Sequence, residues 1–244
     1  MKALCFLDEE YPVQLRHITD FPVLLFVKGN LDVFSRRINV ALVGTRKPSD
    51  TAKKATWRLG MKFSEYQCNI VSGLAMGCDT FAHESSITSG GKTLAVLPCG
   101  IYNIYPKSNI GLANRIIESG GAIVSEYPVM HKPHKAEYIE RDRIISALSD
   151  IVTVVESGRN GGTIHTANYA IEQDKILACF QHSKYTEESA GNKMLIEEKG
   201  AIPISIEDDI RNLTELANNR RRVRNLEKLT KIAPHIEKQL SFFD

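Results

Sequence analysis

Residues 39–46, with the sequence Asn39-Val40-Ala41-Leu42-Val43-Gly44-Thr45-Arg46, decide the fold class of this 244-residue chain. The apolar residues follow one another without alternating with polar ones, as in a strand that helices cover on both faces. A glycine turn ends the predicted strand Val40–Gly44, and a helix-forming segment follows over Thr51–Tyr66. This succession is the unit from which parallel sheets with covering helices are built.

The same unit recurs along the chain as far as residue 204. Further strands are predicted at Ile70–Ser72, Thr93–Pro98, Ala122–Glu126, Ile151–Glu156, Ile176–Cys179 and, more weakly, Ala201–Ile204. Further helices are predicted at Thr80–Ser89, Ile110–Glu118, around Arg143–Leu148, at Thr163–Gln173 and at Asn192–Glu198. Repeated units of this kind predict an α/β fold, a doubly wound and mostly parallel sheet with helices on both faces.

The two ends of the chain differ from this pattern. Residues 1–38 contain Pro12 and Pro22 before an apolar strand at Val23–Val27, and we interpret them as an N-terminal extension packed on the core domain, residues 39–205. Residues 206–238 are polar and helix-forming, which predicts a C-terminal helical extension, and residues 239–244 form a short tail.

Composition limits the possible partners. The 31 basic and 29 acidic residues nearly balance, so contact with nucleic acid requires a local cluster of cations rather than a global field. The five cysteines are scattered without a Cys-x-x-Cys pair, which favours reduced thiols in a cytoplasmic protein, and we predict neither a metal nor a cofactor. The N-terminus does not resemble a signal peptide, and no apolar run approaches the roughly 18 residues of a membrane span.

Glycine-rich loops follow the predicted strands. Ligands of open α/β sheets bind at the carboxyl ends of the strands, where glycine lets backbone N–H groups approach an anion closely. These loops include Gly44-Thr45-Arg46, Ser72-Gly73-Leu74-Ala75-Met76-Gly77 and Ser157-Gly158-Arg159-Asn160-Gly161-Gly162-Thr163. For any single cluster a tight βα turn is the favoured explanation, but three at one sheet edge, two of them with arginine, favour a phosphate-binding crevice. The chain lacks G-x-G-x-x-G, which argues against an ordinary NAD or FAD site.

The ordered motifs of residues 11–204 also resemble those of one protein family. They include Val43-Gly44-Thr45-Arg46, Val71-Ser72-Gly73-Leu74-Ala75, Ser125-Glu126-Tyr127-Pro128 and Arg141-x-Arg143-Ile144-Ile145. In this order they are similar to the motifs of the DprA/Smf family of bacterial DNA-processing proteins. The resemblance implies an extended Rossmann-like domain, usually a homodimer, that binds single-stranded DNA and helps to load a RecA-type recombinase without catalysing a reaction.

The resemblance also implies which residues bind. The arginine of the Gly-Ser/Thr-Arg turn, here Arg46, is expected to contact a DNA phosphate. The expected phosphate-binding set is Gly44, Thr45, Arg46, Ser72, Gly73, Arg141, Arg143, Gly161, Gly162 and Thr163. Tyr138 is a candidate platform on which an unpaired base stacks, although packing alone explains this residue nearly as well.

Two departures from the family pattern are evident. Asp142 stands between the two arginines where the family has asparagine, and we expect its carboxylate to neutralise part of the pocket. The loop before the helix at residue 163 keeps its glycines and hydroxyls but gains Arg159 and His165.

Several other polar residues have both a functional and a structural interpretation. Asp79 and His83 share a helix face and suggest an acid/base pair, but a helix cap and a packed polar residue are favoured. Glu126 and Glu156 are placed to bind a ribose hydroxyl or, slightly favoured, to hold the loop arginines. The run Arg220-Arg221-Arg222 with Arg224 is either a solvated helix face or a phosphate contact.

Two alternative functions remain open from the sequence. The fold also resembles phosphoribohydrolases and nucleotide sensors, in which a Gly-Gly-Thr loop such as Gly161-Gly162-Thr163 holds a phosphate. The C-terminal residues Gln239, Leu240, Phe242 and Phe243 are similar to peptides that dock on the polymerase sliding clamp, which suggests a replication adaptor, although the tail can equally fold back on the domain.

Overall fold

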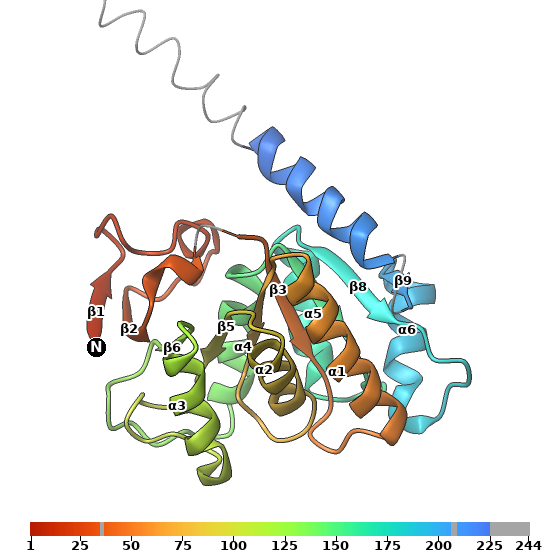
Figure 1. Cartoon of the computed structure of the whole chain (residues 1–244), viewed down its shortest axis with the longest axis horizontal. Coiled ribbons are helices and arrows are strands. Elements are labelled where there is room, and N and C mark those ends of the chain that lie inside the picture. Colours follow the sequence, from red (N-terminus) through yellow and green to blue (C-terminus); the bar gives the residue numbers. More distant parts are fainter. Residues whose placement is uncertain (35–36, 206–208, 225–244) are drawn as a thin grey trace, which may run out of the picture.

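A computed structural model describes residues 1–34, 37–205 and 209–224 of the chain (Figure 1). Its centre is a nine-stranded sheet with the strand order β1-β2-β6-β5-β4-β3-β7-β8-β9. The strands are β1 (Lys2–Cys5), β2 (Leu24–Gly29), β3 (Asn39–Val43), β4 (Asn69–Ser72), β5 (Thr93–Val96), β6 (Ala122–Ser125), β7 (Ile151–Val154), β8 (Ile176–Phe180) and β9 (Ile202–Ile204). The pairings from β6 through β9 are parallel, whereas β1 and β2 pair antiparallel at one edge.

The chain winds in two directions from β3. It passes through β4 and β5 to β6 on one side, and then returns to place β7 against the other side of β3. The sheet therefore has its topological switch point between β3 and β7. The predicted doubly wound, mostly parallel α/β fold is confirmed.

Helices cover both faces of the sheet. On one face lie α1 (Asp50–Glu65), α2 (Cys78–Thr88) and α3 (Ile110–Glu118), and α1 and α2 pack on buried residues of β3 and β4 such as Leu42 and Ile70. On the other face lie α4 (Glu137–Ala147), α5 (Thr163–Glu172) and α6 (Ala190–Lys199), over residues such as Val43 and Val154. Each central strand thus presents apolar residues to both layers, which explains its unbroken apolar sequence.

Residues 1–34 extend the sheet at the β6 edge. β2 pairs with both β1 and β6, and Leu25 and Val27 on β2 are buried in the same core cluster as α4 and α5. Strand β1 is not among the elements predicted from the sequence, because its four residues include an exposed Lys2 and have no periodicity of their own. It forms through its pairing with β2.

Helix α4 begins earlier than the sequence predicts. The expected helix lay around Arg143–Leu148, but α4 starts at Glu137 and places the charged residues Arg141 and Arg143 in buried positions. Two buried arginines interrupt the apolar stripe by which an amphipathic helix is recognised. The pattern therefore conceals the first half of the helix.

Residues 209–224 form a helix that packs on the face covered by α1. Most of its basic run is paired with aspartates of the core domain: Arg221 binds Asp150 through two hydrogen bonds of 2.8 and 2.7 Å, and Arg220 and Arg224 lie within 3.6 and 3.1 Å of Asp174. These contacts dock the helix on the sheet and leave less of its charge for phosphate. The tail residues Gln239, Leu240, Phe242 and Phe243 lie outside the described residues. No helix within the described ranges is long and apolar enough to cross a membrane.

Candidate functional site

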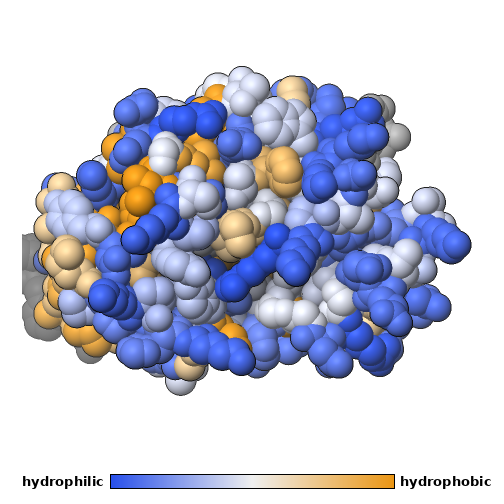
Figure 2. All heavy atoms as spheres, turned by 90° about the horizontal axis from the view of Figure 1, so that it is seen from below, coloured by the Kyte–Doolittle hydropathy of each residue, from blue (hydrophilic) through white to orange (hydrophobic). Residues whose placement is uncertain are grey.

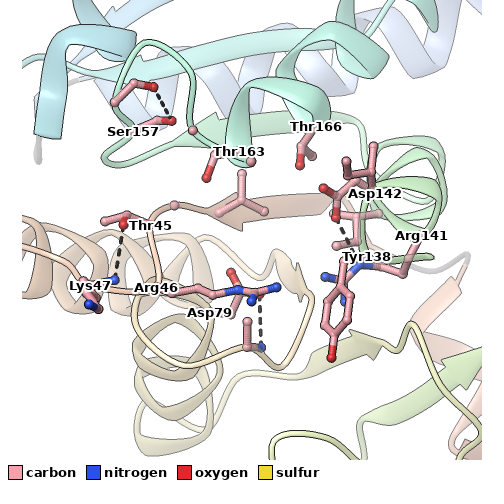
Figure 3. A pocket seen from close by; sticks show the side chains of 18 of the residues that line it. Thr45, Arg46, Lys47, Asp79, Tyr138, Arg141, Asp142, Ser157, Thr163 and Thr166 are labelled. Atoms are coloured by element: carbon pink, nitrogen blue, oxygen red, sulfur yellow. Dashed lines mark hydrogen bonds and ion pairs between the residues drawn. The ribbon is translucent and has the colours of Figure 1, made fainter. Parts of the chain in front are cut away.

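A cavity of about 770 Å³ opens at the carboxyl ends of the strands, at the switch point between β3 and β7 (Figure 3). The loops that follow β3 and β7 form two of its sides, and the N-terminal half of α4 forms a third. In the face seen in Figure 2, hydrophilic residues cover most of the surface, and the apolar residues gather toward one side. The cavity is lined by Val43, Gly44, Thr45, Arg46, Lys47, Ala75, Asp79, Tyr105, Lys135, Tyr138, Ile139, Arg141, Asp142, Ile145, Ser157, Gly158, Gly161, Gly162, Thr163 and Thr166.

Arg46 is the most accessible arginine of this cavity. Its guanidinium carbon lies 4.8 Å from the centre of the Tyr138 ring, a cation–π contact between the β3 loop and α4. Tyr138 in turn meets the exposed ring of Tyr105 edge-on, with ring centres 6.5 Å apart. No carboxylate among the described residues forms an ion pair with Arg46, so its charge is available to an anion.

Gly44 and Thr45 position Arg46 but do not themselves form an open cradle. A Cβ on Gly44 would lie 2.5 Å from the Sγ of Cys78, so only glycine lets α2 approach the turn this closely. The N–H of Thr45 donates to the carbonyl of Glu156 at 2.8 Å, and its carbonyl accepts from the N–H of Cys78 at 3.1 Å. The turn is therefore locked between β7 and α2, and it projects the side chain of Arg46 over the cavity.

The start of α5 lines the cavity with glycines and hydroxyls. The N–H groups of Ile164 and His165 donate to the carbonyls of Gly161 and Gly162 at 3.0 Å, so among the described residues the N–H groups of Gly162 and Thr163 are the ones left for a ligand. The helix dipole adds partial positive charge there. Gly162 has open space on its Cβ side, and the hydroxyls of Thr163 and Thr166 line the same cavity (Figure 3). The Gly161-Gly162-Thr163 segment thus lies in the predicted crevice.

Ser72 and Gly73 occupy a different position from the one expected. The hydroxyl of Ser72 is buried and donates to the carbonyl of Leu42 at 2.8 Å, and the N–H of Gly73 donates to the carboxylate of Asp79 at 3.1 Å. The N–H of Ala75 binds the same oxygen at 3.2 Å. Because Asp79 already occupies these donors, the loop after β4 serves as a closed support for the cavity and not as an open phosphate cradle.

Arg141 forms the floor of the cavity. Its guanidinium is buried and donates to the carbonyls of Gly73, at 2.8 Å, and Val96, at 2.5 Å, while its Nε donates to Asp142 at 3.0 Å. These bonds tie α4 to β4 and β5. Its main role in this geometry is to hold the loops together and to place positive charge beneath the cavity.

Two buried carboxyls accompany Arg141. Burial raises the pKa of Asp142 and that of Asp79, although the charge of Arg141 opposes the rise at both groups. Asp142 contributes a carboxylate to the cavity wall, next to Thr166, as Figure 3 shows. The Asp142 carboxylate accepts a hydrogen bond from Nε of Arg141 at 3.0 Å, so these two groups form an ion pair in the floor of the cavity.

Arg143 does not line the cavity. Its side chain donates to both carboxylate oxygens of Glu126, at 2.7 and 2.6 Å, and to the carbonyl and carboxylate of Asp20, at 2.9 and 3.0 Å. Burial disfavours its charge, but Glu126 outweighs this effect and raises the pKa of Arg143. The structure thus places Arg143 in a junction between α4, β6 and the N-terminal extension, away from the expected binding set.

The remaining polar candidates also have internal partners. Glu156 accepts from the N–H and hydroxyl of Ser49 at the start of α1, and Arg159 donates to Glu198 of α6 at 2.9 Å. Of the two carboxylates expected to hold loop arginines, Glu126 binds Arg143 of helix α4, and Glu156 binds no arginine within residues 1–34, 37–205 and 209–224. His83 is fully buried and its Nδ1 lies 2.7 Å from the hydroxyl of Thr93.

Two lysines at the cavity are missing from the predicted set. Lys47 follows Arg46 in the same turn, and Lys135 lies just before α4. Both are exposed, and within the described ranges neither forms an ion pair. The adjacency of Lys47 to Arg46 was a usable signal, whereas Lys135 reaches the cavity only through the path of the β6–α4 connection. Together with Arg46 they surround the cavity mouth with positive charge.

The chain resembles known proteins over most of its length. A family model described as DNA recombination-mediator protein A matches residues 2–215. The chain is 34% identical to the DNA processing protein DprA of Bacillus subtilis over 208 residues, which cover 85% of this chain and 70% of that protein. It is 37% identical to the DprA of Streptococcus pneumoniae (84% of this chain, 72% of that protein) and 35% identical to protein Smf of Escherichia coli (84% and 55%). The chain thus spans between about half and three quarters of the length of these relatives.

Solved structures of DNA processing proteins also superpose on this chain. The DNA processing protein A of Streptococcus pneumoniae superposes with a TM-score of 0.80 at 34% identity, over 86% of this chain and 73% of that one. A homologue from Helicobacter pylori, described for its single-stranded DNA binding mode, superposes at 0.79 with 27% identity, over 88% and 97%. A molybdenum cofactor binding protein from Rippkaea orientalis shares the fold alone, with a TM-score of 0.52 at 16% identity. From the match over residues 2–215 and these identities, the chain belongs to the DNA recombination-mediator protein A family, which includes the DprA and Smf proteins.

Proposed function

We propose that this chain binds single-stranded DNA across the cavity mouth and that a backbone phosphate lies between Arg46 and the N-terminus of α5. The observation that carries the proposal is the group of exposed cations without ion-pair partners in the described structure, Arg46, Lys47 and Lys135, around one cavity at the switch point of the sheet. Exposed cations of this kind bind phosphate without first breaking an ion pair, and a helix N-terminus adds N–H donors for the same anion.

Tyr138 gives the site a feature that suits an unpaired base. Its ring is half-buried beside Tyr105, and the face that Arg46 covers becomes available when the guanidinium moves to a phosphate. Stacking of a base on an aromatic ring tolerates any sequence and requires a base that is not already paired. The relative from Helicobacter pylori, whose single-stranded DNA binding is described, supports this choice of ligand.

The scaffold residues have a separate role in this proposal. Ser72, Gly73 and Arg141 hold the loops and the floor, and Arg143 joins α4 to the N-terminal extension. Gly44 and Thr45 fix the turn, whereas Gly162 and Thr163 offer donors to the ligand. Direct contact with DNA is therefore assigned to Arg46, Lys47, Lys135, Tyr138 and the Gly161-Gly162-Thr163 segment.

The test is a titration of fluorescently labelled oligothymidylate by anisotropy, for the parent protein and Arg46→Ala at several salt concentrations. We expect the variant to bind about tenfold more weakly at low salt, since a charge-assisted hydrogen bond contributes roughly 1.5 kcal/mol or more. The slope of log affinity against log salt should fall in magnitude by about 0.7, the value for one phosphate contact with a single strand.

The matched control is Arg115→Ala. Arg115 is an exposed arginine of α3 that lies 3.5 Å from Glu84 and does not line the cavity. The Arg115→Ala variant should bind the oligonucleotide with the affinity of the parent protein. Equal affinity and equal salt slope for Arg46→Ala and the parent would show that the phosphate site is elsewhere.

We further propose that no bond of the DNA is broken and that the bound strand passes to a RecA-type recombinase, with a homodimer as the working unit. The family description as a recombination mediator supports transfer of the strand to a recombinase. The rate at which recombinase filaments assemble on protein-coated single-stranded DNA, in single-molecule or bulk assays, measures this transfer. Sedimentation equilibrium of the full chain measures the oligomeric state. Filament assembly at the same rate with and without this protein would contradict the loading step.

A nucleotide-directed enzyme is the second candidate, because Asp79 and Asp142 bring two buried carboxyls with raised pKa values to the same cavity as the start of α5. Both are engaged with neighbouring donors in this structure, Asp79 with loop N–H groups and Asp142 with Arg141, which supports binding over catalysis. Release of free base from a panel of nucleoside monophosphates would favour the enzyme, and the double variant D79N/D142N should then abolish it.

The proposed clamp-docking tail, Gln239–Asp244, is tested separately. Co-elution of the full chain with a polymerase sliding clamp, lost after deletion of residues 239–244, would support the replication adaptor. If the intact chain does not co-elute, this role is excluded.

A further inference from the structure

The connection between β6 and α4 brings two imidazoles and a carboxylate to one point. The side-chain donor atoms of His131, His134 and Glu137 all lie within 4.8 Å of one another. Elsewhere in the described chain no other group of three histidine, cysteine or acidic side chains converges in this way. These residues are not among the predicted site residues and do not line the cavity, although His-x-x-His-x-x-Glu is a readable spacing.

The position of His131 is fixed by neighbouring loops. Its carbonyl accepts hydrogen bonds from the N–H of Gly100, at 3.0 Å, and from the side-chain amide of Asn103, at 3.1 Å. Its ring stacks on Tyr127 with ring centres 4.9 Å apart and an angle of 16° between the planes. The first ligand of the cluster is therefore held in place before anything binds.

Glu137 is equally well placed. It is the first residue of α4, and its carboxylate accepts from His131 Nε2 at 2.9 Å and from the N–H of His134 at 2.6 Å. Its side chain is only 14% exposed. The ring of His134, by contrast, is exposed, and its centre lies 5.8 Å from that of His131, so it can turn toward the other two.

The spacing of these atoms suits a tetrahedral zinc ion. Zinc bonds of about 2.0–2.2 Å to nitrogen and oxygen place neighbouring ligand atoms roughly 3.3 Å apart. The separations in the cluster, from 2.9 Å to at most 4.8 Å, lie on both sides of this value, so a rotation of the exposed His134 ring completes the set. Two imidazoles and one carboxylate also match the preference of Zn²⁺, while Ca²⁺ and Mg²⁺ prefer all-oxygen ligands.

We propose that His131, His134 and Glu137 form a binding site for one Zn²⁺ ion, with solvent as the fourth ligand. The site takes its ligands from both ends of the segment 131–137 and thereby ties the β6–α4 connection to the first turn of α4. This segment includes Lys135 and precedes Tyr138, which both line the cavity. If the proposed function holds, zinc also fixes these two residues for the DNA strand.

Metal binding is measured on the full, untagged chain after removal of metal by chelation. Zn²⁺ is titrated against a chromophoric chelator, and Co²⁺ is used in parallel because a tetrahedral site gives it strong visible absorption. We expect one equivalent of Zn²⁺ to bind the parent, and at least tenfold weaker binding to His134→Gln and to Glu137→Gln. His165→Gln, which replaces an exposed histidine of α5 outside the cluster, should bind zinc as the parent does.

The experiment has clear alternative outcomes. His134 is exposed, so His134→Gln should keep the fold, which circular dichroism verifies. Absence of zinc binding to the parent, or equal affinity for the parent and both ligand variants, would show that the cluster is only a hydrogen-bonded clamp of the loop. Arg46→Ala should retain full zinc binding, so a failure of the DNA proposal and a failure of the zinc proposal give different results.

Discussion

Arg143 provides the sharpest contrast between a DNA contact and a structural contact. Its guanidinium is buried and pairs with Glu126 through two hydrogen bonds of 2.7 and 2.6 Å. In Arg143→Met the carboxylate of Glu126, which is 16% exposed, would remain in the protein without its main partner. Breaking a buried ion pair from one side reduces the free energy of unfolding by about 3–5 kcal/mol, whereas the exposed Asp20, 82% accessible, adds little.

Urea unfolding followed by far-ultraviolet circular dichroism measures this change. With a denaturant slope of about 2–3 kcal/mol per molar, the midpoint should fall by roughly 1–2 M. Arg115→Met, which removes an exposed arginine paired with Glu84, should change the free energy by less than about 1 kcal/mol. In the absence of urea, Arg143→Met should bind oligothymidylate with the affinity of the parent.

The opposite pattern would refute this reasoning. If Arg143→Met unfolds at the midpoint of the parent but loses affinity for single-stranded DNA, then Arg143 leaves Glu126 to bind phosphate directly. Together with Arg46→Ala, which should lose affinity and keep stability, the pair separates the two roles.

Three further predictions concern packing, ionisation and docking. Gly44→Ala should lower the free energy of unfolding by about 1–3 kcal/mol, because the new Cβ would lie 2.5 Å from the buried thiol of Cys78 in α2. Gly162→Ala, whose new Cβ would have no neighbour within 4 Å, should leave the free energy of unfolding unchanged. Thermal unfolding of both variants measures the difference. Burial lowers the pKa of Lys175 to about 8 from an ordinary value of 10.5, so between these two pH values the unfolded state binds one more proton than the folded state. The stability of the parent relative to Lys175→Met should therefore rise as pH increases from about 8 to 10.5. A stability difference that does not change with pH would contradict the shift. Arg221→Ala, which removes two hydrogen bonds to an aspartate of the core domain, should speed proteolytic cleavage within residues 209–224, whereas cleavage of Arg222→Ala, whose side chain is exposed, should match the parent.

The arginines of α4 show where sequence reasoning stops. Arg141 and Arg143 both match a family motif, and their sequence neighbours do not distinguish their roles. In the structure Arg141 donates hydrogen bonds to the backbone carbonyls of Gly73 and Val96, whereas Arg143 donates to the carboxylate of Glu126. These partners are 17 to 68 residues away in the chain, and only the packing of α4 against the sheet brings them within reach.

The loop after β4 shows that a glycine-rich composition does not by itself make a phosphate-binding loop. Ser72 and Gly73 have the composition of a phosphate loop, but Asp79 accepts the N–H groups that a phosphate would need. Asp79 follows Gly73 by six positions, and the turn of the chain at the start of α2 brings the two residues together. Composition shows which donors exist, and tertiary structure shows which of them are already used.

The sequence alone determined the fold class, the positions of most strands and the edge of the sheet at which the site lies. Unbroken apolar runs followed by glycine, alternating with helix-forming segments, are typical of buried parallel strands with loops at their carboxyl ends. The tertiary structure decided which charges face the cavity. Among the described residues Arg46, Lys47 and Lys135 form no ion pair, while Arg141 and Arg143 bind carbonyls and carboxylates inside the protein. A buried charge must find a partner, and an exposed one need not.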